Sequence, residues 1–221
     1  MRLPIGTHGD EGWIDRVELY VALILQFAIV VITISALFQS QWLLALSGTA
    51  VLILTFTPAL IERQLRVPLP VEFTLITCLF LFASFVLGEA GNFYERIWWW
   101  DMALHGLSAV ITGLIGFLFI YVFYMTHRIR VEPMYVAILT FGLAVAVGTL
   151  WEIFEFLADW FLGLNMQRSG LVDTMTDLML NSAGAILAAA IGYYYVKNGD
   201  SLLGRRLIRM LVERVRQRIA N

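Results

Sequence analysis

Charged residues and cysteine are scarce in this chain. Asp, Glu, Lys and Arg make up 14% of its 221 residues, whereas 60% are hydrophobic and the mean hydropathy is +0.78. Because a typical soluble domain carries about 25% charged residues, this composition excludes that class. The single cysteine, Cys78, lies within an apolar run and has no second cysteine to pair with, which excludes a disulfide framework and a thiolate metal site. We therefore expect an integral membrane protein.

The first 16 residues are polar and lack the basic start and the small-residue cleavage site of a signal peptide. After this N-terminal segment, 1–16, six apolar stretches reach the length of about 20 residues that a helix needs to cross a bilayer. They are 17–38, 42–61, 70–89, 99–125, 134–158 and 172–196. Since backbone groups within lipid must be paired inside the chain, the sequence predicts an all-α fold, a bundle of six transmembrane helices over residues 17–196.

Basic residues are concentrated in alternate loops. The N-terminal segment, the second and fourth loops and the C-terminal tail together hold 13 Lys and Arg, against only Arg96 and Arg168 on the other side. The positive-inside rule then places both termini in the cytoplasm. Trp98, Trp99 and Trp100 fall at the outer interface, where amphipathic rings settle at the level of the lipid headgroups. We expect a multi-pass protein of the cytoplasmic (inner) membrane.

The C-terminal tail, 197–221, is strongly basic, with seven Lys and Arg in its 25 residues. Residues 202–219 fit an amphipathic helix. Its apolar arc comprises Leu203, Leu207, Ile208, Leu211, Val215 and Ile219, and its basic arc comprises Arg205, Arg206, Arg209 and Arg216. We expect this helix to lie on the inner leaflet and to bind anionic lipids, with the binding of a partner protein as the alternative.

Ionisable side chains interrupt the last three predicted spans, although each unpaired charge costs several kcal/mol inside a membrane. Asp101 and His105 are four residues apart and share one helix face. The next span carries Glu152 and Glu155, in a stripe with Gly148 and Asp159, and the last carries Asp173, Asp177 and Asn181 at intervals of four. Because successive spans run in opposite directions, the three sets fall at one depth near the outer face. We expect them to meet.

A bound metal ion is one solution to the charge in this set. Five carboxylates would surround His105, and like charges cannot all ionise in a medium of low dielectric constant. A divalent ion, a bound cationic group or shared protons would relieve the repulsion, and carboxylate with imidazole ligands suits Mg, Mn, Zn or Fe. The candidate catalytic residues are Asp101, His105, Glu152, Glu155, Asp173 and Asp177, and all of them except Asp173 are candidate metal ligands.

A purely structural interpretation of these residues stays open. An Asp and a His at this spacing often only hydrogen-bond each other, and acids near the interface can be hydrated. Glu155, Asp159 or Asp173 could instead pair with Arg168 or Arg96 from the outer loops.

The remaining polar and small residues carry less information. Gln26 and Thr55 are isolated polar positions within apolar spans of the first half. In the second half, small residues at Gly106, Gly113, Gly116, Ser182, Gly184, Ala188 and Gly192 predict that the helices pack closely.

The order of these motifs resembles that of known families. Asp101-x-x-x-His105, Glu152-x-x-Glu155, Arg168 and Asp173-x-x-x-Asp177-x-x-x-Asn181-x-x-Gly184 are similar to the YjdF-like family of uncharacterised bacterial membrane proteins and, more distantly, to VanZ-like proteins. The likeness covers about residues 98–192. VanZ-like proteins usually carry Gln where Glu155 stands, and a Pro-Gly before the loop arginine, so the YjdF-like family fits better. The resemblance implies a site in this region but no particular reaction, although VanZ-like proteins are associated with glycopeptide resistance at the cell surface.

Three functions are consistent with these features. The first is an enzyme that acts on a lipid or lipid-linked substrate entering from the membrane, with a metal ion or a carboxylate base activating the nucleophile. Arg168 would hold a phosphate headgroup, while Asn181, Trp100 and Trp151 would contact the substrate. The second is a carrier of a small cation, a proton or an amine. The third is a non-enzymatic accessory subunit that binds a larger membrane complex. The candidate protein partners are accordingly a second copy of this chain, in a homo-oligomer, or a membrane complex. We expect membrane lipids and no nucleic acid as partners.

Overall fold

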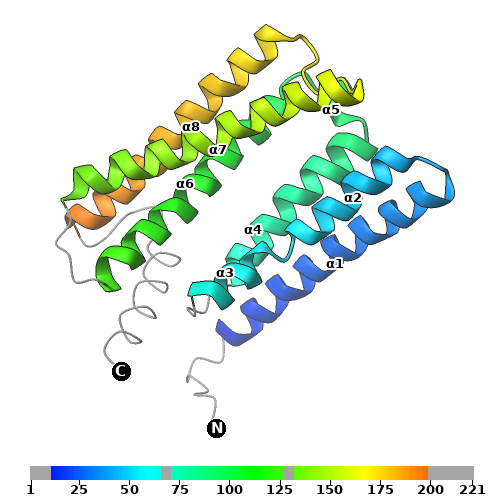
Figure 1. The fold of residues 1–221 in the computed structure, drawn as a ribbon. Coiled ribbons are helices and arrows are strands. Elements are labelled where there is room, and N and C mark those ends of the chain that lie inside the picture. Colours follow the sequence, from blue (N-terminus) through cyan, green and yellow to red (C-terminus); the bar gives the residue numbers. More distant parts are fainter. Residues whose placement is uncertain (1–10, 66–70, 127–131, 199–221) are drawn as a thin grey trace. The chain divides into compact units, whose positions relative to one another are not determined.

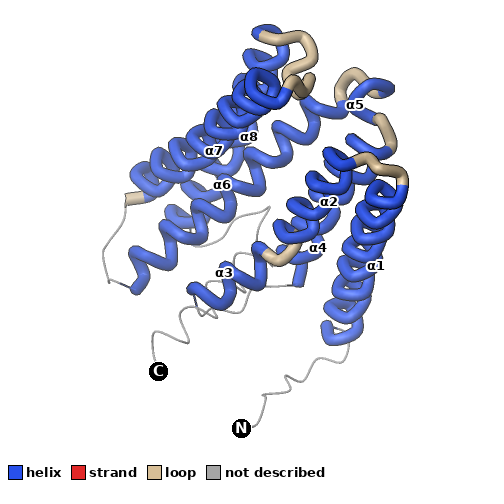
Figure 2. Tube along the Cα trace, turned by 45° about the vertical axis from the view of Figure 1, so that its right-hand side comes forward, coloured by secondary structure: helices blue, strands red, loops and turns tan. Residues whose placement is uncertain are grey.

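The computed structural model describes residues 11–65, 71–126 and 132–198, and nearly all of them are helical. No strand occurs within these ranges, as the tube in Figure 2 shows. Among the described residues, six helices are long and apolar enough to cross a membrane: Trp13–Phe38, Trp42–Gln64, Val71–Ala90, Trp100–Tyr121, Pro133–Leu162 and Leu171–Lys197. The all-α fold with six spans is thereby confirmed, and the chain is membrane-embedded.

The chain divides into two compact units, residues 1–96 and 97–221. The predicted amphipathic helix at 202–219 lies outside the described residues, as does most of the N-terminal segment.

The first unit is built around its longest helix, α1 (Glu11–Phe38), which packs against α2 (Trp42–Leu54) and α4 (Val71–Phe82). Each of these two partners continues into a second helical segment. α2 is followed by α3 (Thr57–Leu65), and α4 runs directly into η1 (Ala83–Ala90), a π-helix. The short α5 (Phe93–Arg96) packs on η1 and ends the unit.

The second span is broken where α2 gives way to α3. Pro58 lies in the first turn of α3, and a proline ring clashes with the carbonyl of the residue four positions earlier, which here is Leu54, the last residue of α2. Thr55, inside the break, donates its hydroxyl to the Leu52 carbonyl at 2.6 Å and accepts the Gln26 amide at 3.0 Å. Gln26 and Thr55 are therefore paired with each other, which corrects the prediction that they are isolated.

The described part of the second unit contains three long helices that all pack against one another, α6 (Trp100–Thr126), α7 (Pro133–Leu162) and α8 (Leu171–Asn198). Figure 1 shows them side by side in green, yellow-green and orange. α7 begins with Pro133, because a proline in the first turn loses no hydrogen bond. It ends at Leu162, past the predicted end at residue 158, and the left-handed φ of 66° at Gly163 closes the helix.

Small residues bring α6 and α8 close together. A Cβ atom at Gly184 would lie 2.5 Å from the carbonyl oxygen of Gly106, and one at Gly113 would lie 2.5 Å from the Cβ atom of Ala188. Both distances are well below van der Waals contact, so at Gly184 and Gly113 only glycine fits without a shift of a helix. The predicted close packing of the second half therefore occurs between α6 and α8. It also occurs between α6 and α7, where a Cβ atom at Gly116 would lie 2.6 Å from Leu143, whereas a Cβ atom at Gly106 would have no neighbour within 4 Å.

Candidate functional site

The candidate residues of the second unit come from three helices and lie at the same end of the bundle. Asp101 and His105 occupy the first two turns of α6, and Asp173 and Asp177 the first two turns of α8. Acids in the first turn of a helix, such as Asp101 and Asp173, interact favourably with the exposed N–H groups there. α7 runs in the opposite direction, so Glu152 and Glu155 lie near its C-terminal end. The alternation of helix direction therefore places the three sets together.

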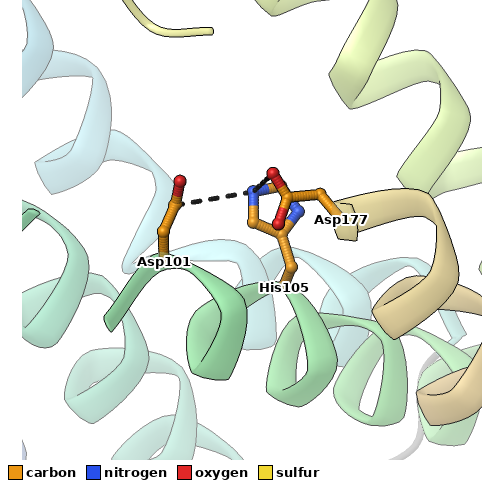
Figure 3. Close-up of side chains that lie close together, drawn as sticks. All are labelled: Asp101, His105 and Asp177. Atoms are coloured by element: carbon orange, nitrogen blue, oxygen red, sulfur yellow. Dashed lines mark ion pairs between the residues drawn. The ribbon is translucent and has the colours of Figure 1, made fainter. Parts of the chain in front are cut away.

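His105 lies at the centre of this arrangement. Its Nε2 atom is 3.7 Å from Asp101 Oδ1 and 3.8 Å from Asp177 Oδ2, and its Nδ1 atom is 3.5 Å from Glu152 Oε1. Figure 3 shows that the two aspartates approach the same ring nitrogen. All three distances exceed the 2.7 to 3.2 Å of an ordinary N–H···O hydrogen bond. The ring nitrogens and the carboxylate oxygens are therefore close to one another, but none of the three pairs forms an ordinary hydrogen bond.

Two overlapping triads have their potential ligand atoms within 4.8 Å of one another: Asp101, His105 and Asp177, and His105, Glu152 and Glu155. We call these five residues the His105 cluster. Two atoms that bind one ion at about 2.0 to 2.2 Å are about 3 to 3.6 Å apart in tetrahedral or octahedral geometry. Either triad therefore needs only small side-chain shifts to hold an ion.

Glu152 is the least satisfied member of the His105 cluster. Its side chain is buried, with the whole residue 3% exposed, and neither oxygen makes a hydrogen bond with another described residue. A buried carboxylate without donors pays a large desolvation cost. Glu155 is buried too, but its Oε1 accepts the indole N–H of Trp151 at 2.8 Å. Glu152 therefore depends on His105, or on a bound cation, for compensation.

Asn181 lies one helical turn deeper than Asp177 and is also buried. Neither atom of its amide makes a hydrogen bond with good geometry within the described part of the chain, although the amide lies near the His105 ring and acts on it electrostatically. A Cβ atom at Gly148 would lie 2.7 Å from Asn181 Nδ2, so the absence of a side chain at Gly148 makes room for this amide. Contact between Asn181 and a substrate stays a prediction, and the structure places the residue beneath the His105 cluster.

Asp159 does not join the cluster, although it continues the stripe of Glu152 and Glu155. Its two carboxylate oxygens accept the backbone N–H groups of Met166 and Gln167 at 2.7 and 2.8 Å. Asp159 therefore holds the loop between α7 and α8, a role for which the sequence offers no signal beyond its position near the helix end. The suggested pairing of Asp159 with an outer arginine is replaced by these backbone contacts.

The same loop carries Arg168, which is half-buried. The side chain of its neighbour Gln167 donates to Thr174 Oγ1 at 2.7 Å, which ties the loop to the first turn of α8. From this position the positive charge of Arg168 acts on Asp101 and on the half-buried Asp173. Arg168 therefore lies at the Asp101 side of the cluster.

The two candidate tryptophans differ in their surroundings. Trp151 is 47% exposed and reaches the cluster through its hydrogen bond to Glu155, an i, i+4 contact that the sequence spacing permits. Trp100 is half-buried, with its ring centroid 5.9 Å from that of Trp99. Contact of either ring with a substrate stays a prediction.

Comparison with known proteins identifies the family. A family model described as "Predicted membrane protein (DUF2238)" matches residues 17–198. An uncharacterised protein of Thermotoga maritima is 32% identical over 138 residues, which cover 62% of this chain and 70% of the relative. No solved structure matches the chain. The more distant VanZ-like resemblance rests on motif spacing alone and stays a prediction. The chain belongs to the DUF2238 family of predicted membrane proteins, to which the YjdF-like resemblance also refers.

Proposed function

We propose that this protein is a membrane enzyme that holds a divalent metal ion in the His105 cluster and acts on a lipid or lipid-linked substrate. The observation that carries the proposal is the burial of Glu152, without a hydrogen bond from any described residue, beside a histidine that also faces Asp101 and Asp177. A bound cation compensates all of these groups at once.

The charges of the cluster support a divalent ion. Four carboxylates surround one imidazole, which supplies at most a single positive charge, and Arg168 adds compensation at Asp101. The donor set of carboxylate oxygens and one imidazole suits Mg, Mn, Zn or Fe. When bound, such an ion supplies Lewis acidity and activates water. A carboxylate of the cluster would accept the proton of the nucleophile.

The surroundings of the site favour a lipid as the substrate. Large apolar side chains are exposed around this end of the second unit: Trp98, Trp99, Trp160, Phe161, Leu162, Leu171 and Val172. They keep a membrane close to the site, and Arg168 would bind a phosphate headgroup through its planar fork of N–H donors. The proposal includes the predicted orientation, with both termini in the cytoplasm of a cell and the cluster near the outer face of the inner membrane.

A carrier is less well supported than an enzyme, because the second unit is tightly filled beneath the cluster. A Cβ atom at Gly113 would meet Ala188 at 2.5 Å and Ala144 at 3.4 Å, so the three helices are in close contact at this level. Farther along, the rings of Phe117 and Tyr195 pack with centroids 5.8 Å apart. The cluster therefore has the form of a site that is closed at its inner end.

The proposal is tested by the lipids of cells that carry the wild-type protein or a variant. His105→Ala removes the centre of the cluster, whereas Leu107→Ala, on the same helix, shortens a side chain that is 48% exposed and serves as the matched control. We expect mass spectrometry of total lipids to show the loss of a product with His105→Ala and with gene deletion, but not with Leu107→Ala. Identical lipids in all four strains would refute the enzymatic proposal.

A further inference from the structure

We infer that the ion is held on the Nε2 side of His105 by Asp101 and Asp177, and that Glu152, on the Nδ1 side, is a positioning residue that orients the ring. The inference deepens the proposed function and rests on it. It reduces the five candidate ligands to three and gives Glu152 a different role.

The chemistry of imidazole requires a choice between the two triads. A neutral imidazole has one nitrogen with a free lone pair, and the other nitrogen carries a proton. His105 can therefore bind an ion through Nε2 or through Nδ1, but not through both. The nitrogen that does not bind the ion becomes a donor and needs an acceptor.

The Nε2 side has the geometry of a ligand set. Asp101 and Asp177 come from different helices, α6 and α8, and place oxygens 3.7 and 3.8 Å from this one nitrogen (Figure 3). These separations are within a few tenths of an ångström of those between ligands of one ion. The Asp101 side chain is also 25% exposed, so this side leaves an open position for water or a substrate, as catalytic metal sites require.

The Nδ1 side has the features of a supporting shell. Glu152 and Glu155 are both buried, and Trp151 already donates a hydrogen bond to Glu155. Histidines that bind metals almost always donate their second N–H to a carboxylate or a carbonyl, which sets the tautomer and the ring orientation. Glu152 Oε1, 3.5 Å from Nδ1 and without a hydrogen bond from any described residue, is the acceptor that this arrangement needs.

The opposite assignment leaves more groups unsatisfied. With the ion on the Nδ1 side, the Nε2–H group would face both Asp101 and Asp177 but could donate a hydrogen bond to only one of them. The indole N–H of Trp151 would also compete with the ion for Glu155. The Nε2 assignment avoids both conflicts.

The test is a titration of the purified full-length protein with Co²⁺, followed by its visible absorption and repeated by competition with Zn²⁺. We expect Asp177→Asn to abolish detectable binding. Glu152→Gln should keep the band positions of the wild type and weaken binding by about 10- to 100-fold, the effect of removing a supporting carboxylate. Glu152→Asp, which keeps the charge, serves in place of Glu152→Gln if the latter fails to elute as a monodisperse species.

Two results would overturn the inference, and they are distinguishable. If Asp177→Asn still binds Co²⁺ while Glu152→Gln or Glu152→Asp does not, or if the band positions change with Glu152 rather than with Asp177, the ion lies on the Nδ1 side and the proposed metal site stands. If the wild-type protein binds neither Co²⁺ nor Zn²⁺, the metal site itself is refuted.

Discussion

At the scale of single residues, the second unit contains a buried carboxylate that its described neighbours leave without a hydrogen bond. Glu152 is buried among acids and accepts no hydrogen bond from them, so in the absence of a cation it lowers the stability of the fold. A loss of fold stability of this kind is typical of functional sites, where a residue that is required for activity can destabilise the fold.

Glu152→Gln is therefore expected to stabilise the metal-free protein. Removal of a buried charge that lacks donors should raise the free energy of unfolding by about 1 to 2 kcal/mol. The measurement is thermal unfolding in detergent with a chelator present, with Glu132→Gln, at an exposed position, as the control. A lower unfolding midpoint for Glu152→Gln than for the wild type would show that Glu152 is satisfied without a cation.

Asp159 makes the opposite contribution, because its carboxylate accepts two backbone N–H groups of the loop between α7 and α8. Asp159→Ala should lower the free energy of unfolding by about 2 to 3 kcal/mol, since hydrogen bonds to charged groups contribute about 1.5 to 3 kcal/mol each and water replaces part of the loss in a half-buried position. Metal affinity should change far less than with Asp177→Asn. If Asp159→Ala reduced metal affinity as much as Asp177→Asn does, Asp159 would belong to the His105 cluster.

At the scale of helices, the geometry of the cluster depends on the close contact between α6 and α8. Gly184 lies two turns beyond Asp177 on α8, and a Cβ atom there would lie 2.5 Å from the Gly106 carbonyl oxygen and 2.9 Å from the Ala109 Cβ atom. Gly106 directly follows His105. Any side chain at Gly184 must therefore push apart the two segments that carry His105 and Asp177.

Gly184→Ala is expected to weaken Co²⁺ binding by about tenfold or more, because misplacement of ligands by a few tenths of an ångström weakens a metal site. Gly142→Ala is the matched control, since a Cβ atom at Gly142, on α7, has no neighbour within 4 Å. Equal affinities for the two variants would mean that α6 and α8 adjust without a change at the cluster.

Most helix limits could be predicted from the sequence to within a few residues, because apolar runs must be long enough to cross a bilayer, although α1 begins at Glu11 rather than at residue 17. The break at Pro58 and the π-helix η1 could not, since the hydropathy of both spans continues through them. The convergence of Asp101, Glu152 and Asp177 followed from alternating helix direction. The ring orientation of His105 and the bonding of Asp159 to a loop depend on side-chain rotamers and loop geometry, which no spacing rule specifies.

At the scale of the whole molecule, the proposed chemistry depends on which face of the membrane the cluster approaches. The single native cysteine, Cys78, is fully buried, so the wild-type chain gives a low background for thiol labelling. Asn165, in the α7–α8 loop, and Glu132, before α7, are both exposed positions at opposite ends of α7.

Asn165→Cys is expected to react with a membrane-impermeant maleimide in intact cells, because the basic loops and termini are predicted to face the cytoplasm. Glu132→Cys should react only after the membrane is permeabilised. The reverse pattern would place the cluster on the cytoplasmic side and would change the pool of lipids that can reach it.

The central claim is that the His105 cluster holds a divalent metal ion, and the most direct measurement is the metal content of the purified protein. Mass spectrometry of full-length protein, prepared without chelators and dialysed against metal-free buffer, should find about one equivalent of a divalent ion per chain in the wild type. The same preparation of His105→Ala should contain less than about a tenth of that amount, and Leu107→Ala should match the wild type. Two results would contradict the account. In one, the wild-type protein contains no metal even after incubation with divalent ions; in the other, His105→Ala contains as much metal as the wild type.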